Sequence, residues 1–232
     1  MLYVSVGSTC NNCGETNREN ATLLRMRTDG SDRGVYASGL RNMIGWDWHP
    51  ATGQLWGMDH GSDWRGDDLP PEELNRVENG THYGWPFCYG DRRVDAFTPA
   101  APPGGDRQGF CRRTAAPVLT YTAHAAPIGM VFYKGMQFPA EYRGDAFVAM
   151  RGSWNRRPPS GYKLVRIRFD AAGSPTRIED FVTGFLSRDG QAFRGRIAGV
   201  AVARDGSVLF ADDTNGVIYR VAYAGGGRAG SR

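Results

Sequence analysis

The chain has 232 residues, a formal net charge of +4 and a hydrophobic content of 41%. That content can build a buried core, but no run of about 18 apolar residues is present to span a membrane. The mild positive charge, without a long basic stripe, argues against nucleic acid as a partner. The 32 glycines and 13 prolines favour many short strands joined by turns over a helical bundle.

A recurring pattern of a glycine, an apolar run, a turn and a second apolar run is the strongest signal in the sequence. It occurs in GWDWHPATGQLWGMDHG, GMVFYKGMQFPAEYRGDAFVAMRG and GVAVARDGSVLFADDTNG. A third apolar segment follows each copy, and the apolar runs have the strand period of two. Repeated units of this kind predict an all-β fold, a β-propeller.

The repeats divide the chain into about four units, of which the first is incomplete. Strands are expected at 2–7 and 21–30, on either side of a polar loop. The later units are expected at 34–95, 119–184 and 190–224. Because a propeller needs about four to eight blades to close, we expect an open ring with exposed edge strands on its N-terminal side.

Residues 1–224 are therefore expected to form one partial β-propeller domain, and the Gly-rich tail 225–232 is expected to be disordered. The segment LYVSVGS after Met1 is typical of a buried strand whose preceding partner is absent. We expect the chain to be the C-terminal part of a longer protein, with N-terminal blades missing and no signal peptide in this sequence. Polar excursions at 61–72 and 90–118 are long enough to be functional.

The four cysteines form two pairs, Cys10 with Cys13 and Cys88 with Cys111. An even number in a loop-rich chain favours structural disulfides in an oxidising compartment, and Cys88 and Cys111 flank an excursion that a disulfide would close. A redox role and a metal site are the alternatives, since a CxxC pair permits both.

Polar residues beside the expected inner strands are candidates for a binding site. Arg41, His124 and Arg196 each precede the glycine of a repeat by a few residues. In a ring of blades, equivalent positions point toward one axis, so these three groups would form an anion-binding well. The structural alternative is that the Arg-Asn pair at 41–42 ties down its loop and that His124 is a hydrogen-bonded core residue.

Two further segments carry polar groups at the ends of expected strands. Residues 59–63 offer His60, two carboxylates and backbone carbonyls, an oxygen-rich set that suits calcium. Residues 151–156 contain two arginines, a tryptophan and an asparagine. The structural alternative for the acidic segment is a solvated surface loop.

Seven segments resemble the quinoprotein glucose/sorbosone dehydrogenase family, and most of all its L-sorbosone dehydrogenase-like branch. They are LYVSVGSTCNNC, ASGLRNMIGWDWHP, TGQLWGMDHGSDWRGDDLPPEELNRV, HYGWPFCYGD, AHAAPIGMVFY, FPAEYRGDAFVAMRGSWNR and YKLVRIRFD. The resemblance covers residues 2 to about 222. It implies a six-bladed β-propeller that binds pyrroloquinoline quinone (PQQ) with Ca²⁺ and oxidises sugars, in the periplasm or as a secreted protein.

The resemblance also implies roles for individual residues. The residues implied as cofactor contacts are Arg41, Asn42, His60, His124, Arg151, Trp154, Asn155 and Arg196. The backbone carbonyls of Gly61 and Ser62 match the ligands of the cofactor's calcium, which takes hard oxygen ligands. The family's general base is a histidine that lies before the strand matched by LYVSVGS. The histidines present here, none of which matches that position, are His49, His60, His82 and His124.

The expected function is PQQ- and calcium-dependent oxidation of a sugar aldehyde or aldose of the sorbosone or glucose type, with hydride transfer to the quinone. The expected partners of the full-length protein are a sugar substrate and an electron acceptor such as a quinone or cytochrome. Without the base, which contributes a factor of about 10²–10⁴, we expect this chain alone to be inactive or nearly so. The alternative is a non-catalytic propeller that serves as a carbohydrate- or protein-binding module.

Overall fold

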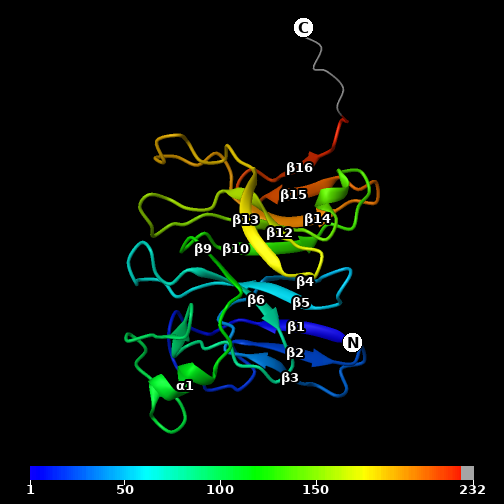
Figure 1. Cartoon of the computed structure of the whole chain (residues 1–232). Helices are drawn as coiled ribbons and strands as arrows, with labels where there is room; N and C mark the ends of the chain where they lie inside the picture. The colour runs from blue at the N-terminus through cyan, green and yellow to red at the C-terminus, as the bar shows by residue number, and fades with distance from the viewer. Residues whose placement is uncertain (226–232) are drawn as a thin grey trace.

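The computed structural model describes residues 1–225, which form four antiparallel sheets and one two-stranded ribbon. Figure 1 shows that the sheets follow one another in chain order from the N-terminal to the C-terminal end of the molecule. The prediction of an all-β fold is confirmed, and the arrangement is like that of a β-propeller. Residues 226–232, most of the tail that the sequence predicts to be disordered, lie outside the described residues.

Each sheet is a meander of strands that follow one another along the chain. The first sheet contains β1 (Leu2–Val6), β2 (Thr22–Met26) and β3 (Gly34–Ser38). The second contains β4 (Gly45–Trp48), β5 (Leu55–Asp59), β6 (Glu72–Val77) and β9 (Leu119–Tyr121). The third contains β10 (Pro127–Phe132), β11 (Ala146–Met150), β12 (Lys163–Phe169) and β13 (Pro175–Val182). The fourth contains β14 (Ile197–Val202), β15 (Val208–Asp212) and β16 (Val217–Val221).

The boundaries predicted for two repeat units are wrong. Residue 34 does not open the second unit, because β3 pairs with β2 in the first sheet, with Arg25 opposite Gly34. Residue 119 does not open the third unit, because β9 pairs with β6, with Leu74 opposite Leu119. In both cases the outermost strand of a sheet immediately precedes the loop to the next sheet, and sequence periodicity alone assigned it to the wrong unit.

The excursion at 90–118 contains regular structure as well as loop. A ribbon of β7 (Cys88–Tyr89) and β8 (Arg93–Val94) precedes the helix α1 (Arg107–Arg113). The Asp106 side chain caps this helix by accepting a hydrogen bond of 2.8 Å from the Gly109 N–H. Among the described residues, no helix is long and apolar enough to cross a membrane.

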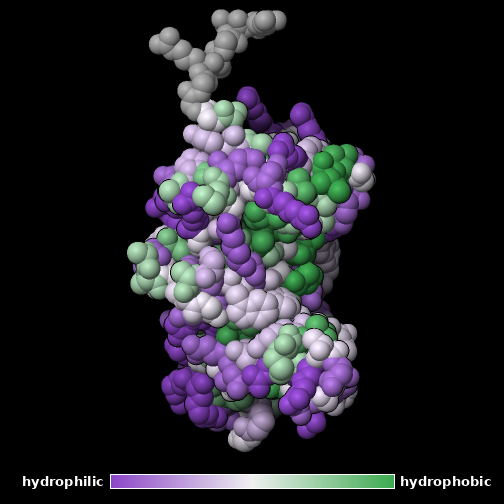
Figure 2. Space-filling view, turned by 90° about the vertical axis from the view of Figure 1, so that its right-hand side faces the viewer, coloured by the Kyte–Doolittle hydropathy of each residue, from purple (hydrophilic) through white to green (hydrophobic). Residues whose placement is uncertain are grey.

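The core lies in layers between successive sheets. One layer joins the second and third sheets, with Trp56 and Met58 packed against Phe132 and Val148. Strand β11 is buried along its whole length because sheets cover both of its faces, which explains its unbroken apolar run AFVAM. Figure 2 shows that apolar surface on one side of the molecule gathers mainly toward the C-terminal sheets, among hydrophilic residues.

Strand alternation places several long loops at one end of the sheets. Because neighbouring strands are antiparallel, alternate strands run in the same direction, and the loops that follow them emerge at the same end of the sheets. The loops at this end are residues 7–21, 39–44, 60–71, 122–126, 151–162, 183–196 and 213–216. All of the residues predicted to bind the cofactor or calcium lie in these loops, including Arg196, which immediately precedes β14.

Candidate functional site

Asp63 is the centre of a polar cluster at the loop end of the sheets. Its Oδ2 lies 3.8 Å from Arg41 Nη2, and its Oδ1 lies 4.0 Å from His124 Nδ1. Asn155 Nδ2 donates a hydrogen bond of 2.9 Å to the same carboxylate. The structure therefore brings together three of the predicted site residues, and the Asp63 carboxylate joins them.

Asp59, at the end of β5, fixes the loop that carries Arg41 and Asn42. Its carboxylate accepts hydrogen bonds from the backbone N–H of Arg41 at 2.8 Å and of Asn42 at 2.7 Å. Burial raises the pKa of Asp59 to about 6, although these hydrogen bonds act to lower it. The Asn42 side chain lies against Gly7, where an added Cβ would come within 2.8 Å of its Oδ1.

Glu72, the first residue of β6, joins two of the site loops. Its carboxylate accepts hydrogen bonds from the Gly61 N–H at 3.1 Å and the Ala126 N–H at 2.8 Å. Burial raises the pKa of Glu72 to about 8, against the effect of both hydrogen bonds. Glu72 thus sets the spacing between the loop with His60 and the loop with His124.

The two histidines of the site are held by backbone carbonyls. His60 Nε2 lies 2.7 Å from the Pro127 carbonyl, and His124 Nε2 lies 2.9 Å from the Gly66 carbonyl. Because a carbonyl only accepts hydrogen bonds, these contacts assign the proton to Nε2 in both rings. Burial lowers the pKa of His60 to about 4, so this ring is neutral at pH 7.

The backbone at Gly61 and Ser62 offers oxygen atoms to a cation. Among residues 1–225, no group donates a hydrogen bond to either carbonyl oxygen. A Cβ at Gly61 would lie 2.6 Å from Pro70 Cγ, so the close approach of these two segments requires glycine. Ser62 is buried. Calcium takes hard oxygen ligands of this type, so the donor set fits the ion.

None of the hydrogen bonds or ion pairs of the described residues joins Arg196 to the Asp63 cluster, and Arg196 borders a cavity. Its Nη2 donates a hydrogen bond of 2.6 Å to the Gly152 carbonyl. Its buried Nε has no partner within the described part of the chain. The cavity, of about 430 Å³, is also lined by Tyr162 and by Trp154, the neighbour of Asn155 in the sequence. Arg151 is turned away from this cavity toward Asp213, with which it forms an ion pair.

These groups fit PQQ, which is a flat aromatic quinone with three carboxylates. The unpaired Arg196 Nε is a charged donor suited to a carboxylate. The Trp154 side chain, 64% exposed, offers a ring face. The anion-binding well predicted from Arg41, His124 and Arg196 differs from the arrangement found, because an acidic side chain lies between the first two and, among the described residues, no hydrogen bond or ion pair joins the third to them.

Sequence reasoning missed the central role of Asp63 and the contribution of Asn11. In the sequence Asp63 is one carboxylate of an acidic segment, and Asn11 is one residue between Cys10 and Cys13. Asn11 contacts both Arg41 and Asp63 from a loop 52 residues away from Asp63 in the sequence. No local pattern reveals a contact over that separation; the only available signal was that both motifs adjoin strand ends.

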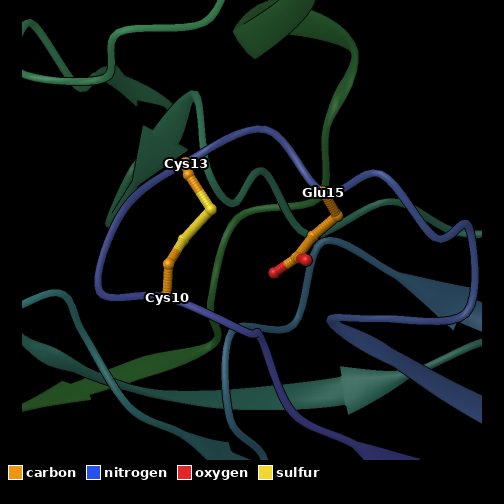
Figure 3. Close-up of side chains that lie close together, drawn as sticks. All are labelled: Cys10, Cys13 and Glu15. Atoms are coloured by element: carbon orange, nitrogen blue, oxygen red, sulfur yellow. A yellow bond between two sulfur atoms is a disulfide. The ribbon is translucent and has the colours of Figure 1, made fainter.

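The predicted Cys88–Cys111 disulfide is present, and Cys10–Cys13, for which the sequence left a disulfide, a redox pair and a metal site open, is a disulfide as well. Cys88–Cys111 connects β7 to α1 and closes the excursion. Cys10, Cys13 and Glu15 lie close together, as Figure 3 shows. Because the two sulfur atoms are bonded to each other, this group is a covalent loop closure rather than a thiolate metal site.

The fold is shared with solved sugar dehydrogenase structures. The iodide structure of the Trichoderma reesei family AA12 enzyme matches with a TM-score of 0.76 and 22% identity over 93% of this chain and 63% of that chain. The holo form of the pyranose dehydrogenase PQQ domain from Coprinopsis cinerea matches with a TM-score of 0.76 and 23% identity, covering 95% and 66%. These likenesses define the fold as that of the propeller-like PQQ dehydrogenases. The chain belongs to the TrAA12-like family, whose sequence profile matches residues 1–224.

Curated relatives extend the comparison. An uncharacterised protein of Borreliella burgdorferi is 34% identical over 225 residues, which are 96% of this chain and 57% of the relative. The PQQ-dependent pyranose dehydrogenase of Coprinopsis cinerea is 30% identical over 168 residues, 59% of this chain and 22% of the relative. The chain thus spans little more than half the length of the first relative and less of the second.

Proposed function

We propose that this chain is the PQQ- and calcium-binding part of a sugar dehydrogenase of the glucose or sorbosone type. The proposal rests on Arg196, which lines a cavity with Trp154 and whose buried Nε has no partner among the described residues, and on the carbonyls of Gly61 and Ser62, which accept no hydrogen bond there. The named relatives support it, since one is a PQQ-dependent pyranose dehydrogenase and the Trichoderma reesei AA12 enzyme was solved as a calcium structure.

Each group in the site has a separate task in this proposal. Bound PQQ supplies a two-electron acceptor for the hydride of a sugar aldehyde or hemiacetal. Arg196 binds a carboxylate, and the carbonyls of Gly61 and Ser62 hold calcium. Asp63 keeps Arg41 and the Asn155 amide in position and offsets the charge of the guanidinium.

We propose that the general base is none of the chain's four histidines, because none of them matches the position of the base that the family resemblance implies. His49 Nδ1 accepts hydrogen bonds from two backbone N–H groups, and His82 Nδ1 accepts one from Gly84. His60 and His124 are held by carbonyls. We therefore propose that residues 1–224 form a partial propeller and that the general base lies outside these residues.

The proposed location is an oxidising compartment, periplasmic or extracellular, because two disulfides are formed. There the enzyme would pass its electrons to a quinone or a cytochrome.

Cofactor titration tests the proposal. PQQ is added to the chain in the presence of calcium, and the quenching of tryptophan fluorescence gives the dissociation constant. Arg196→Ala is expected to weaken binding about tenfold or more, because it removes a charge-assisted hydrogen bond. Arg220→Ala, which removes an exposed arginine paired with Asp205, is the control. Wild-type protein that does not bind PQQ, or an Arg196→Ala variant that binds as tightly, contradicts the proposal.

A carbohydrate-binding module without catalysis is a second candidate, favoured by two exposed tryptophans. Trp64 and Trp154 are 66% and 64% exposed, and their rings meet edge to face at 5.0 Å. Exposed aromatic faces at a loop surface mark sites of interaction. Polysaccharide binding that needs neither PQQ nor calcium, and that is lost in Trp64→Ala, would support this function over the first.

A further inference from the structure

We propose that the loop closed by the Cys10–Cys13 disulfide is a positioning device for Arg41 and Asp63, and that it acts through Asn11. Its significance for cofactor binding rests on the function proposed above. The loop connects β1 to β2 and lies at the end of the sheets where the site is formed. Figure 3 shows that the disulfide and the Glu15 carboxylate both lie inside this loop.

Asn11 makes four hydrogen bonds to the two site residues. Its backbone carbonyl accepts from Arg41 Nε at 3.1 Å, and its side-chain Oδ1 accepts from Arg41 Nη2 at 3.2 Å. The same Oδ1 accepts from the Asp63 N–H at 2.7 Å, and Nδ2 donates to the Asp63 carbonyl at 3.1 Å. Because both ends of the amide are used, its orientation is fixed, and Asn11 sets the separation between the guanidinium and the Asp63 segment.

The loop that presents Asn11 is closed in two places. The disulfide joins residues three apart in the sequence, which restricts the backbone at Asn11. The Glu15 carboxylate makes the second closure. It accepts hydrogen bonds from the Thr9 N–H at 2.8 Å, the Thr9 hydroxyl at 2.7 Å and the Asn20 amide at 3.1 Å. Partial burial acts to raise the pKa of Glu15, but these hydrogen bonds hold it below its ordinary value. The Glu15 carboxylate is therefore ionised at neutral pH.

The neighbouring Asn12 provides an internal comparison, because it has the same side chain but other partners. Its Nδ2 donates to Asp95 Oδ2 at 2.7 Å, and its Oδ1 accepts from the Thr98 hydroxyl at 2.9 Å. Both partners belong to the excursion that follows β8 rather than to the site. Adjacent asparagines in one closed loop therefore serve different parts of the molecule, and only Asn11 contacts Arg41 and Asp63.

Hydrogen exchange tests the positioning role directly. The exchange rate of the Asp63 backbone amide is measured by NMR in the wild-type chain, Asn11→Ala and Asn12→Ala. Asn11→Ala removes the acceptor of that N–H, so exchange is expected to accelerate about tenfold, as for the loss of one hydrogen bond. Asn12→Ala is expected to leave the Asp63 rate unchanged. Equal rates in Asn11→Ala and wild type, or equal acceleration in both variants, overturn the proposal.

The role of the disulfide is tested by a double-mutant cycle. Cys10→Ser/Cys13→Ser is combined with Asn11→Ala, and the Asp63 exchange rate is measured in each background. If the disulfide acts through Asn11, removing it accelerates exchange in the wild-type background and adds little once Asn11 is gone. If removal of the disulfide accelerates exchange by the same factor with and without Asn11, the disulfide does not act through Asn11. Cys88→Ser/Cys111→Ser controls for the loss of a disulfide elsewhere.

The link to function has its own measurement. Asn11→Ala is expected to raise the dissociation constant of PQQ with calcium about tenfold, whereas Asn12→Ala leaves it unchanged. If the wild-type chain does not bind PQQ, the proposed function fails, and the exchange data still decide whether Asn11 positions Asp63. If PQQ binds but equally well to both variants, the positioning does not serve the cofactor site, and this link is overturned.

Discussion

Asn155 donates a hydrogen bond of 2.9 Å to the carboxylate of Asp63, across 92 residues of sequence. This contact joins the loop after β11 to the loop after β5, and so connects the third sheet to the second at the site. Because Asn155 directly follows Trp154, the contact also links the segment that lines the Arg196 cavity to the cluster that holds Arg41.

Asp63→Ala is expected to weaken PQQ binding and to destabilise the loops around the site. It removes the acceptor of the Asn155 amide and the counter-charge of Arg41, a loss of about 1–3 kcal/mol. The measurement is the PQQ dissociation constant together with the midpoint of urea unfolding. Asp67→Ala is the control from the same loop, since its side chain accepts a hydrogen bond only from the exposed Arg157 backbone. Equal binding by both variants would show that Asp63 does not organise the site.

Gly152→Ala is expected to be more destabilising than Gly53→Ala. Both glycines have positive φ, +106° and +68°, which costs about 1–2 kcal/mol for an L-residue. At Gly53 the new Cβ meets no atom within 4 Å, whereas at Gly152 it would lie 2.5 Å from the Tyr162 ring. Overpacking adds about 1–3 kcal/mol at Gly152 alone. Urea unfolding of the two variants measures the difference, and equal losses would count against the close contact with Tyr162.

The free energy of unfolding is expected to fall as the pH rises from 6.5 to 8. Burial raises the pKa of Glu73 from 4.5 to about 8, so between these values the folded state binds the proton more tightly than the unfolded state. Stability gained from this protonation is complete below the unfolded pKa and is lost as the pH rises through the folded pKa. His60 and His82 oppose this trend only below their ordinary 6.5, since burial lowers both of their pKa values to about 4.

Glu73→Gln tests the origin of that slope. The amide keeps an acceptor for the Gly90 N–H, which donates to Glu73 at 2.6 Å, but it has no proton to lose. The variant is expected to lose less stability than the wild type between pH 6.5 and 8 in urea unfolding. Part of the slope persists because burial also raises the pKa of Glu72 to about 8. Glu78→Gln, at an exposed position, is the control, and a slope identical to wild type in Glu73→Gln would refute the assignment.

Removal of the Cys88–Cys111 disulfide is expected to cost about 3 kcal/mol, from the loop entropy of a 23-residue separation. Cys88→Ser/Cys111→Ser is compared with Cys10→Ser/Cys13→Ser, which opens a separation of only 3 residues and is expected to cost less. Chemical unfolding of both double variants under non-reducing conditions gives the comparison. A larger loss for the shorter loop would mean that native contacts, rather than chain entropy, dominate.

Local patterns were sufficient to predict the strands of the repeated hairpins and the Cys88–Cys111 disulfide. The period of two and the recurring glycine identify the pairs β4–β5, β10–β11 and β14–β15, which are hairpins between neighbours in sequence. That disulfide was predictable because its cysteines flank the excursion, whereas the short CxxC spacing of Cys10 and Cys13 also permitted a redox pair or a metal site. These features depend on residues close together in the chain.

Features that depend on distant contacts were not predictable. Strand β9 lies beside β6 although more than 40 residues separate them, and only the pairing of Leu74 with Leu119 assigns it to that sheet. The place of Asp63 between Arg41 and His124 depends on three separate loops in the same way. Periodicity carries no information about which loops meet.

The pairing of β9 with β6 also bears on how this protein tolerates change. The segment between them begins at the end of β6 and finishes at the start of β9. Because the two strands are paired antiparallel, the two ends of the segment are held side by side. Insertions at an exposed turn of this segment would lengthen a surface loop without moving the strands on either side. The excursion is therefore a natural position for length variation during evolution and for grafting a foreign sequence by engineering.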